Sequence, residues 1–266
     1  MRTDILEFHE FYQSPLGRMA ERFIGERLQE AWPSMARLTL AGFGYATPYL
    51  KFFDDADARL ALAPGGQGVM RWPRSGANAA GLVCEDHWPL PDASVDRLIV
   101  VHGLEEAAAP RRLMREIWRV LTDDGRVIIV AAHRRGLWST VDATPFAAGR
   151  PYLKRRLNAL LQDAMFRANA WSAALYFPPV QSQFLLRAAR AWERTGTRAW
   201  PGLGGVIMVE AQKELMAPAG LVRQRARGVI RPIAAPHGAI NVPQRAPRVL
   251  RTRKWGEQDF QESKTP

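Results

Sequence analysis

Apolar positions recur with two different periods along this chain. In the first part, they recur every three or four residues, which predicts amphipathic helices over 4–12 and 14–32. Asp4 is placed to cap the first of these helices, and Ser14 followed by Pro15 is a capping residue with proline at the first helical position. The chain is therefore expected to begin with two helices.

Short apolar runs of strand length follow, and they alternate with helical segments. Strands are predicted at 38–41, 59–63, 81–84, 96–101, 126–132, 174–177 and 205–211. Helices are predicted to begin at Thr47 and Pro110 and to cover 151–166 and 181–194. This alternation is typical of βαβ units that build a mostly parallel sheet. The sequence therefore predicts a Rossmann-like α/β fold, with helices on both faces of a seven-stranded sheet.

The net charge of +11 is concentrated at the C-terminal end. Residues 217–266 hold ten basic and three acidic residues, so they carry +7, and the preceding part carries +4. Their proline and arginine content, without sustained apolar periodicity, predicts a flexible basic tail. We therefore expect one domain over 1–216, with helices over 4–32 and a core over 37–213. The tail either has no specific partner or contacts a polyanion such as RNA, an acidic partner or an anionic membrane surface.

Cysteine and histidine usage limits the chemistry that the chain can support. Cys84 is the only cysteine, so an intramolecular disulfide and a cysteine-based zinc site are both excluded. It has no basic neighbour in sequence and is expected to be a small buried apolar residue. The five histidines are scattered, so we predict no metal site.

Targeting signals are not evident in the sequence. No apolar run approaches the roughly 20 residues of a membrane span, and the N-terminus lacks the apolar core of a signal peptide. We therefore expect a cytoplasmic protein without a transmembrane segment.

The first predicted strand runs into Gly42-Phe43-Gly44, and a helix is predicted to follow. A Gly-x-Gly turn between a strand and a helix lets the backbone approach a ligand at the carboxyl edge of a sheet. The helix N-terminus adds free N–H groups there. Alone, this pattern also fits a plain structural turn, but after the first strand of an α/β alternation it favours a ligand-binding turn.

Four segments in a fixed order resemble the class I S-adenosylmethionine-dependent methyltransferases, in particular the methyltransferase type 11 group. They are residues 40–44 (LAGFG), 89–96 (PLPDASVD), 115–121 (REIWRVL) and 124–128 (DGRVI). The resemblance covers roughly residues 38–209. It implies the strand order 3-2-1-4-5-7-6, with strand seven antiparallel beside strand five and S-adenosylmethionine over the ends of strands one, two and four.

The resemblance also implies the residues of the cofactor site. It places Gly42, Gly44 and Tyr45 beside the methionine part, Glu85 and Asp86 near the adenine, and His102 and Gly103 facing the sulfonium and the substrate. The acid that usually precedes the family's first glycine is Ala41 here. The acid that usually ends strand two and binds the ribose hydroxyls is also missing, and Gln67 is our candidate for a neutral replacement.

These observations lead to two predicted functions. The first is S-adenosylmethionine-dependent methyl transfer to a small molecule or a protein side chain, in which the protein mainly supplies position and desolvation. His102 is then the candidate proton acceptor, although a structural histidine is the alternative. The missing acids favour the second function, a non-catalytic protein of the same fold that binds or scaffolds. Nucleic-acid modification is supported only by the basic tail.

Overall fold

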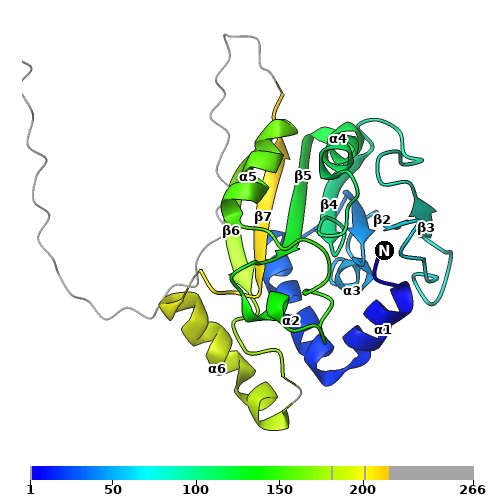
Figure 1. Cartoon of the computed structure of the whole chain (residues 1–266). Coiled ribbons are helices and arrows are strands. Elements are labelled where there is room, and N and C mark those ends of the chain that lie inside the picture. Colours follow the sequence, from blue (N-terminus) through cyan, green and yellow to red (C-terminus); the bar gives the residue numbers. More distant parts are fainter. Residues whose placement is uncertain (1, 181, 201, 216–266) are drawn as a thin grey trace, which may run out of the picture. The chain divides into compact units, whose positions relative to one another are not determined.

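A computed structural model describes residues 2–180, 182–200 and 202–215, apart from the side chains of residues 183–185. The described part contains a seven-stranded sheet with helices on both faces (Figure 1). The strands are β1 (Thr39–Gly44), β2 (Ala58–Pro64), β3 (Ala80–Val83), β4 (Val95–Val101), β5 (Leu121–Ala132), β6 (Phe166–Ala174) and β7 (Val206–Lys213). Their order is β3-β2-β1-β4-β5-β7-β6, which confirms the predicted topology.

Strand directions also agree with the expectation. β1 pairs in parallel with β2 and β4, and the parallel ladder continues to β3 on one side and to β5 on the other. β7 runs antiparallel between β5 and β6. The chain order therefore reverses between β1 and β4, which is the position where open α/β sheets place their ligands.

The helices are α1 (Ile5–Gln13), α2 (Pro15–Ala31), α3 (Thr47–Leu50), α4 (Pro110–Val120), α5 (Lys154–Asp163) and α6 (Gln183–Ala199), with a 3-10 turn over Leu137–Thr140. The predicted caps are present. Asp4 accepts a hydrogen bond from the Leu6 N–H, and Ser14 accepts one from the Gly17 N–H. One core packs α1, α2, α3 and α6 on one face of the sheet, and a second core packs α4 and α5 on the other.

Four predicted element bounds are corrected by the structure. The last helix covers Gln183–Ala199 rather than 181–194. Strand six covers Phe166–Ala174 rather than 174–177, because this edge strand is only partly buried and lacks the continuous apolar run that predicted the inner strands. The helix before it is shorter than predicted and ends at Asp163. Gly42 and Gly44 both lie within β1, which ends at Gly44, rather than in the turn that follows it.

Two burial expectations are also wrong. Cys84 is exposed, in the short turn after β3 where it bridges to His87. Trp192, which the sequence pattern suggested as a core residue, has 39% of its surface exposed on α6. Both lie at the margin of the sheet, where an apolar residue gains burial only if another element covers it.

Two segments that carry the family resemblance meet in space. Arg119 of α4 donates hydrogen bonds to the main-chain oxygens of Leu90 (2.9 Å) and Trp88 (3.1 Å), and it pairs with Glu116. Glu116 in turn accepts from the Trp88 N–H at 2.6 Å. These contacts fix the loop that leads into β4, so the motif is explained by the fold rather than by contact with a ligand.

No helix of the described part is long and apolar enough to cross a membrane. The predicted boundary at residue 216, the basic tail after it and its polyanion contact all lie outside the described residues.

Candidate functional site

The ends of β1 and β4 approach each other closely at the point where the chain order reverses. Gly44, the last residue of β1, has φ +83°, and a Cβ built on it would lie 2.2 Å from the Val101 oxygen and 2.8 Å from the Gly103 nitrogen. The Tyr45 N–H then donates to the same Val101 oxygen at 2.8 Å. Gly44 is therefore required by the fold itself, in addition to any role in ligand binding.

Gly42 and Gly103 are required for similar reasons. A Cβ on Gly42 would lie 2.6 Å from the Cβ of Ala46, and one on Gly103 would lie 2.7 Å from the ring of Phe43. The three glycines thus allow the two strands and the start of α3 to pack tightly, and Gly44 also borders a pocket.

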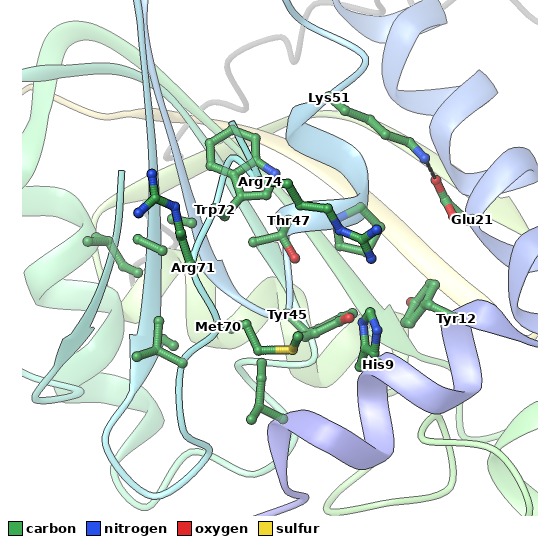
Figure 2. A pocket seen from close by; sticks show the side chains of 18 of the residues that line it. His9, Tyr12, Glu21, Tyr45, Thr47, Lys51, Met70, Arg71, Trp72 and Arg74 are labelled. Carbon is green, nitrogen blue, oxygen red and sulfur yellow. Dashed lines mark ion pairs between the residues drawn. The ribbon is translucent and has the colours of Figure 1, made fainter. Parts of the chain in front are cut away.

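A cavity of about 330 Å³ lies beside Gly44, and we call it the α1 pocket. Its lining comes from α1, α2, the α3 turn, β2, the first residue of β3 and the loop between those strands (Figure 2). The polar and aromatic residues at its wall include His9, Tyr12, Tyr45, Thr47 and Trp72. Its size and mixed lining are those of a small-molecule site.

The charges around the α1 pocket are mostly positive. Lys51, Arg71 and Arg74 line it, and Glu21 is the single carboxylate among the lining residues. Glu21 forms an ion pair with Lys51, drawn as a dashed line in Figure 2. Arg71 donates a hydrogen bond to the main-chain oxygen of Gly76, whereas Arg74 lines the pocket without a carboxylate from the pocket's own lining.

His102 follows β4 and is held in an aromatic cluster. It is 3% exposed, and its ring centroid lies 4.8 Å from that of Phe8 and 4.5 Å from that of Phe146. Its φ of +52° is unusual for a residue other than glycine, and such strain is concentrated at functional sites. Burial lowers the pKa of His102 to about 3, so the ring is neutral at pH 7.

A chain of hydrogen bonds joins His102 to the α1 pocket. Its Nε2 lies 2.9 Å from the hydroxyl oxygen of Tyr12, which lines the pocket, and that oxygen lies 2.8 Å from the hydroxyl of Tyr49. His102 thus reaches the pocket only through Tyr12. Burial, together with the neighbouring Tyr49, raises the pKa of Tyr12 well above 10.

The first residues of the chain lie across the carboxyl ends of β3 and β4. Residues 2–4 precede α1, and we call them the N-terminal strap. Arg2 donates to one oxygen of Glu85, after β3, through Nε (3.0 Å) and Nη2 (2.6 Å). Glu106, after β4, accepts from the main-chain N–H (3.0 Å) and the hydroxyl (2.7 Å) of Thr3.

The end of β2 lies under the same segment. The main-chain oxygen of Gln67 accepts from the Ile5 N–H at 2.8 Å, at the point where the strap joins α1. The Gln67 side chain is fully buried, and neither atom of its amide has a hydrogen-bond partner within the described residues. In Figure 1 the N-terminus is marked beside β2 and β3.

The predicted site residues therefore fall into separate groups. Gly44 and Tyr45 border the α1 pocket, whereas Gln67 and Glu85 lie under or against the N-terminal strap. Asp86 belongs to neither group, because it is exposed and pairs with Arg112 on the surface of α4.

Sequence reasoning missed the residues that connect these groups. Tyr12, Arg74 and the strap residues Arg2 and Thr3 were not among the candidates. The apolar face of α1 contains Tyr12, but no local pattern indicates that its hydroxyl meets a residue 90 positions away.

Comparison with known proteins supports the fold, and one segment of the chain matches a family model. Residues 62–129 match the sequence profile of a methyltransferase domain. Uncharacterised proteins of Mycobacterium tuberculosis and Mycobacterium bovis are 26% identical over 220 residues, which cover 79% of this chain and 74% of theirs.

Two solved structures have a similar fold. A S-adenosylmethionine-dependent methyltransferase of Thermotoga maritima superposes with a TM-score of 0.52 at 16% identity and covers 79% of this chain and 96% of its own. The cyclase SpnF superposes with a TM-score of 0.51 at 20% identity, covering 74% of this chain and 81% of its own.

Proposed function

We propose that the chain is a class I S-adenosylmethionine-dependent methyltransferase that methylates a small molecule bound in the α1 pocket. The observation that carries this proposal is the position of the pocket, beside Gly44 and Tyr45 where the strand order reverses. Ligands of open α/β sheets bind at this point. A cavity of about 330 Å³ suits a small molecule better than a protein side chain that arrives with its own backbone.

At the carboxyl edge of the sheet, the side chain of Gln67 is the group that fits the cofactor. Its buried amide offers two donors and an acceptor without partners, and such a group can pair with the vicinal hydroxyls of a ribose. Gly44, Gly103 and Tyr45 would border the methionine part, and Glu85 would lie near the adenosine. S-Adenosylmethionine would supply a methyl group that its sulfonium sulfur has already activated.

The charge of the pocket supports an acceptor that carries an acidic group. Arg74 and Arg71 line the pocket, while Glu21 is already paired with Lys51. Arg74 is exposed, so its guanidinium is accessible to a carboxylate or phosphate, with which it forms an oriented, charge-assisted contact. We therefore propose that Arg74 holds the acidic group of the acceptor.

Tyr12 and His102 would take up the proton that a hydroxyl acceptor loses on methylation. In this proposal, the acceptor gives its proton to the Tyr12 oxygen while Tyr12 passes its own proton to Nε2 of His102, 2.9 Å away. His102 is neutral before the step, as this requires. A methylated hydroxyl oxygen that still carries its proton is a strong acid, so a weak base suffices.

An activity assay with methyl-labelled S-adenosylmethionine tests the proposal. The protein is incubated with a panel of small organic acids and, separately, with unfolded protein chains. We expect label in a small acid. Label found only in protein would refute the proposed acceptor class.

Variants then test the assigned residues. Arg74→Ala should raise the KM for the acid at least about tenfold, because the charge-assisted contact is lost, and leave the affinity for S-adenosylhomocysteine unchanged. Arg155→Ala, at an exposed position of α5, is the matched control. Tyr12→Phe should lower kcat without a comparable change in KM. Equal kcat values would exclude the proton path through Tyr12.

The second candidate function is a non-catalytic binding protein of this fold. It is favoured by the missing acid after β2 and by the burial of His102. The fold of the cyclase SpnF also shows that this architecture is not confined to proteins named for methyl transfer. The assay with methyl-labelled S-adenosylmethionine separates the two functions, since the second predicts no methyl transfer even where S-adenosylhomocysteine binds.

A further inference from the structure

The N-terminal strap forms a continuous bridge over the loops that follow three parallel strands. The carbons of the Arg2 side chain lie 3.6–3.9 Å from the point where a Cβ of Gly66, after β2, would stand. Its guanidinium then reaches Glu85 after β3, and the Arg2 side chain is only 8% exposed in this ion pair. The second oxygen of Glu85 accepts from the Ala108 N–H, after β4, at 2.9 Å.

This bridge covers the carboxyl ends of β2, β3 and β4, where the proposed function places the adenosine of the cofactor, and we call this place the trough. The carboxyl ends of parallel strands beside the reversal of strand order form the ligand-binding edge of such sheets. Glu85 and Gln67 are the two residues assigned to the adenosine, and the strap engages the first and adjoins the second. The adenosine and the strap therefore both need the side chain of Glu85, and the strap also lies against Gln67.

The bridged arrangement leaves polar atoms unsatisfied. Within the described residues, both amide atoms of Gln67, Nη1 of Arg2 and Oε2 of Glu106 are buried without a hydrogen-bond partner. Each such atom lowers the stability of the arrangement that buries it. A ligand with several hydroxyl and amino groups can satisfy the Gln67 amide, which the strap does not.

We infer that the strap and the cofactor's adenosine exclude each other, so that the cofactor binds only after residues 2–4 have moved out of the trough. This inference rests on the proposed function and concerns the regulation of its cofactor site. The strap acts as an internal competitor, and the apparent affinity for cofactor equals the intrinsic affinity multiplied by the fraction of molecules with an open trough.

The inference predicts that loosening the strap tightens cofactor binding. Arg2→Ala removes the ion pair with Glu85, and Thr3→Val removes the hydroxyl bond to Glu106 while keeping the shape of the side chain. Each variant should bind S-adenosylhomocysteine more tightly than the wild type, with a gain of about tenfold or more for Arg2→Ala. Arg22→Ala, which breaks an exposed ion pair on α2, is the matched control and should bind like the wild type.

Calorimetric titration of the full chain with S-adenosylhomocysteine, with any affinity tag placed at the C-terminus, measures these affinities. Hydrogen exchange reports the strap directly, because the N–H groups of Thr3 and Ile5 are bonded to Glu106 and Gln67 when it is closed. Saturation with S-adenosylhomocysteine should remove the protection of these two N–H groups against hydrogen exchange.

The possible results separate the inference from the proposed function. Tighter binding by Arg2→Ala, with loss of protection in the bound wild type, supports the inference. Equal affinities, or weaker binding by Arg2→Ala, overturn it and leave the methyltransferase proposal standing. No binding by the folded wild type and by both strap variants overturns both.

Discussion

Replacing Glu105 with glutamine should stabilise the protein, and the gain should grow as pH rises. Glu105 follows β4 and is 5% exposed. One of its carboxyl oxygens accepts from the Ala132 N–H at 2.7 Å, and the other is buried without a partner in the described part of the chain. Burial, opposed in part by the Ala132 bond, raises the pKa of Glu105 from 4.5 to about 7.

The sign and size of the effect follow from this pKa. Between pH 4.5 and about 7 the unfolded chain releases the proton of Glu105 while the folded protein retains it, so folding stability falls as pH rises through this window. The full shift corresponds to about 3 kcal/mol at 1.36 kcal/mol per pKa unit. Glutamine carries no proton to lose and keeps an oxygen for the Ala132 N–H. The variant should therefore gain roughly 2–3 kcal/mol over the wild type between pH 5 and pH 8.

Urea unfolding at pH 5 and pH 8 measures this gain, and thermal melts should show a difference of roughly 5–10 °C for a domain of this size. Glu7→Gln, at an exposed position of α1, is the matched control for the loss of one carboxylate. The reasoning is refuted if Glu105→Gln is equally displaced from the wild type at both pH values. It is also refuted if the variant is less stable at pH 8.

Two further predictions concern the parts of the fold that shape the site. Gly44→Ala should lower the free energy of unfolding by at least about 2 kcal/mol, because of its positive φ and a Cβ at 2.2 Å from the Val101 oxygen. Gly81→Ala, where a Cβ would meet nothing within 4 Å, should be nearly neutral, and similar urea midpoints for the two variants would contradict this account. Arg119→Lys should cost about 2 kcal/mol, since lysine cannot keep the bonds to Glu116 and to the main chain of residues 88 and 90 together. An unchanged melting temperature would show that this contact does not stabilise the loop before β4.

The sequence by itself determined the architecture of this protein. Apolar runs of strand length, separated by segments with helical periodicity, indicate which faces of each element are buried. This pattern lies within the residues of the element itself, so the sequence alone is enough to find it. The strand order, the antiparallel β7 and the caps at Asp4 and Ser14 were all predicted in this way or through the family resemblance. The prediction failed for β6, an edge strand whose partial burial leaves a weak pattern.

Tertiary structure alone decided how the site is arranged. The sequence identified Glu85 and His102 as candidates but gave no sign that Arg2 would engage the first or that Tyr12 would stand between the second and the pocket. These pairs are 83 and 90 positions apart, and they meet only because α1 crosses the carboxyl edge of the finished sheet. Such contacts depend on how the elements pack together and not on the periodicity of any one element, so no local pattern encodes them.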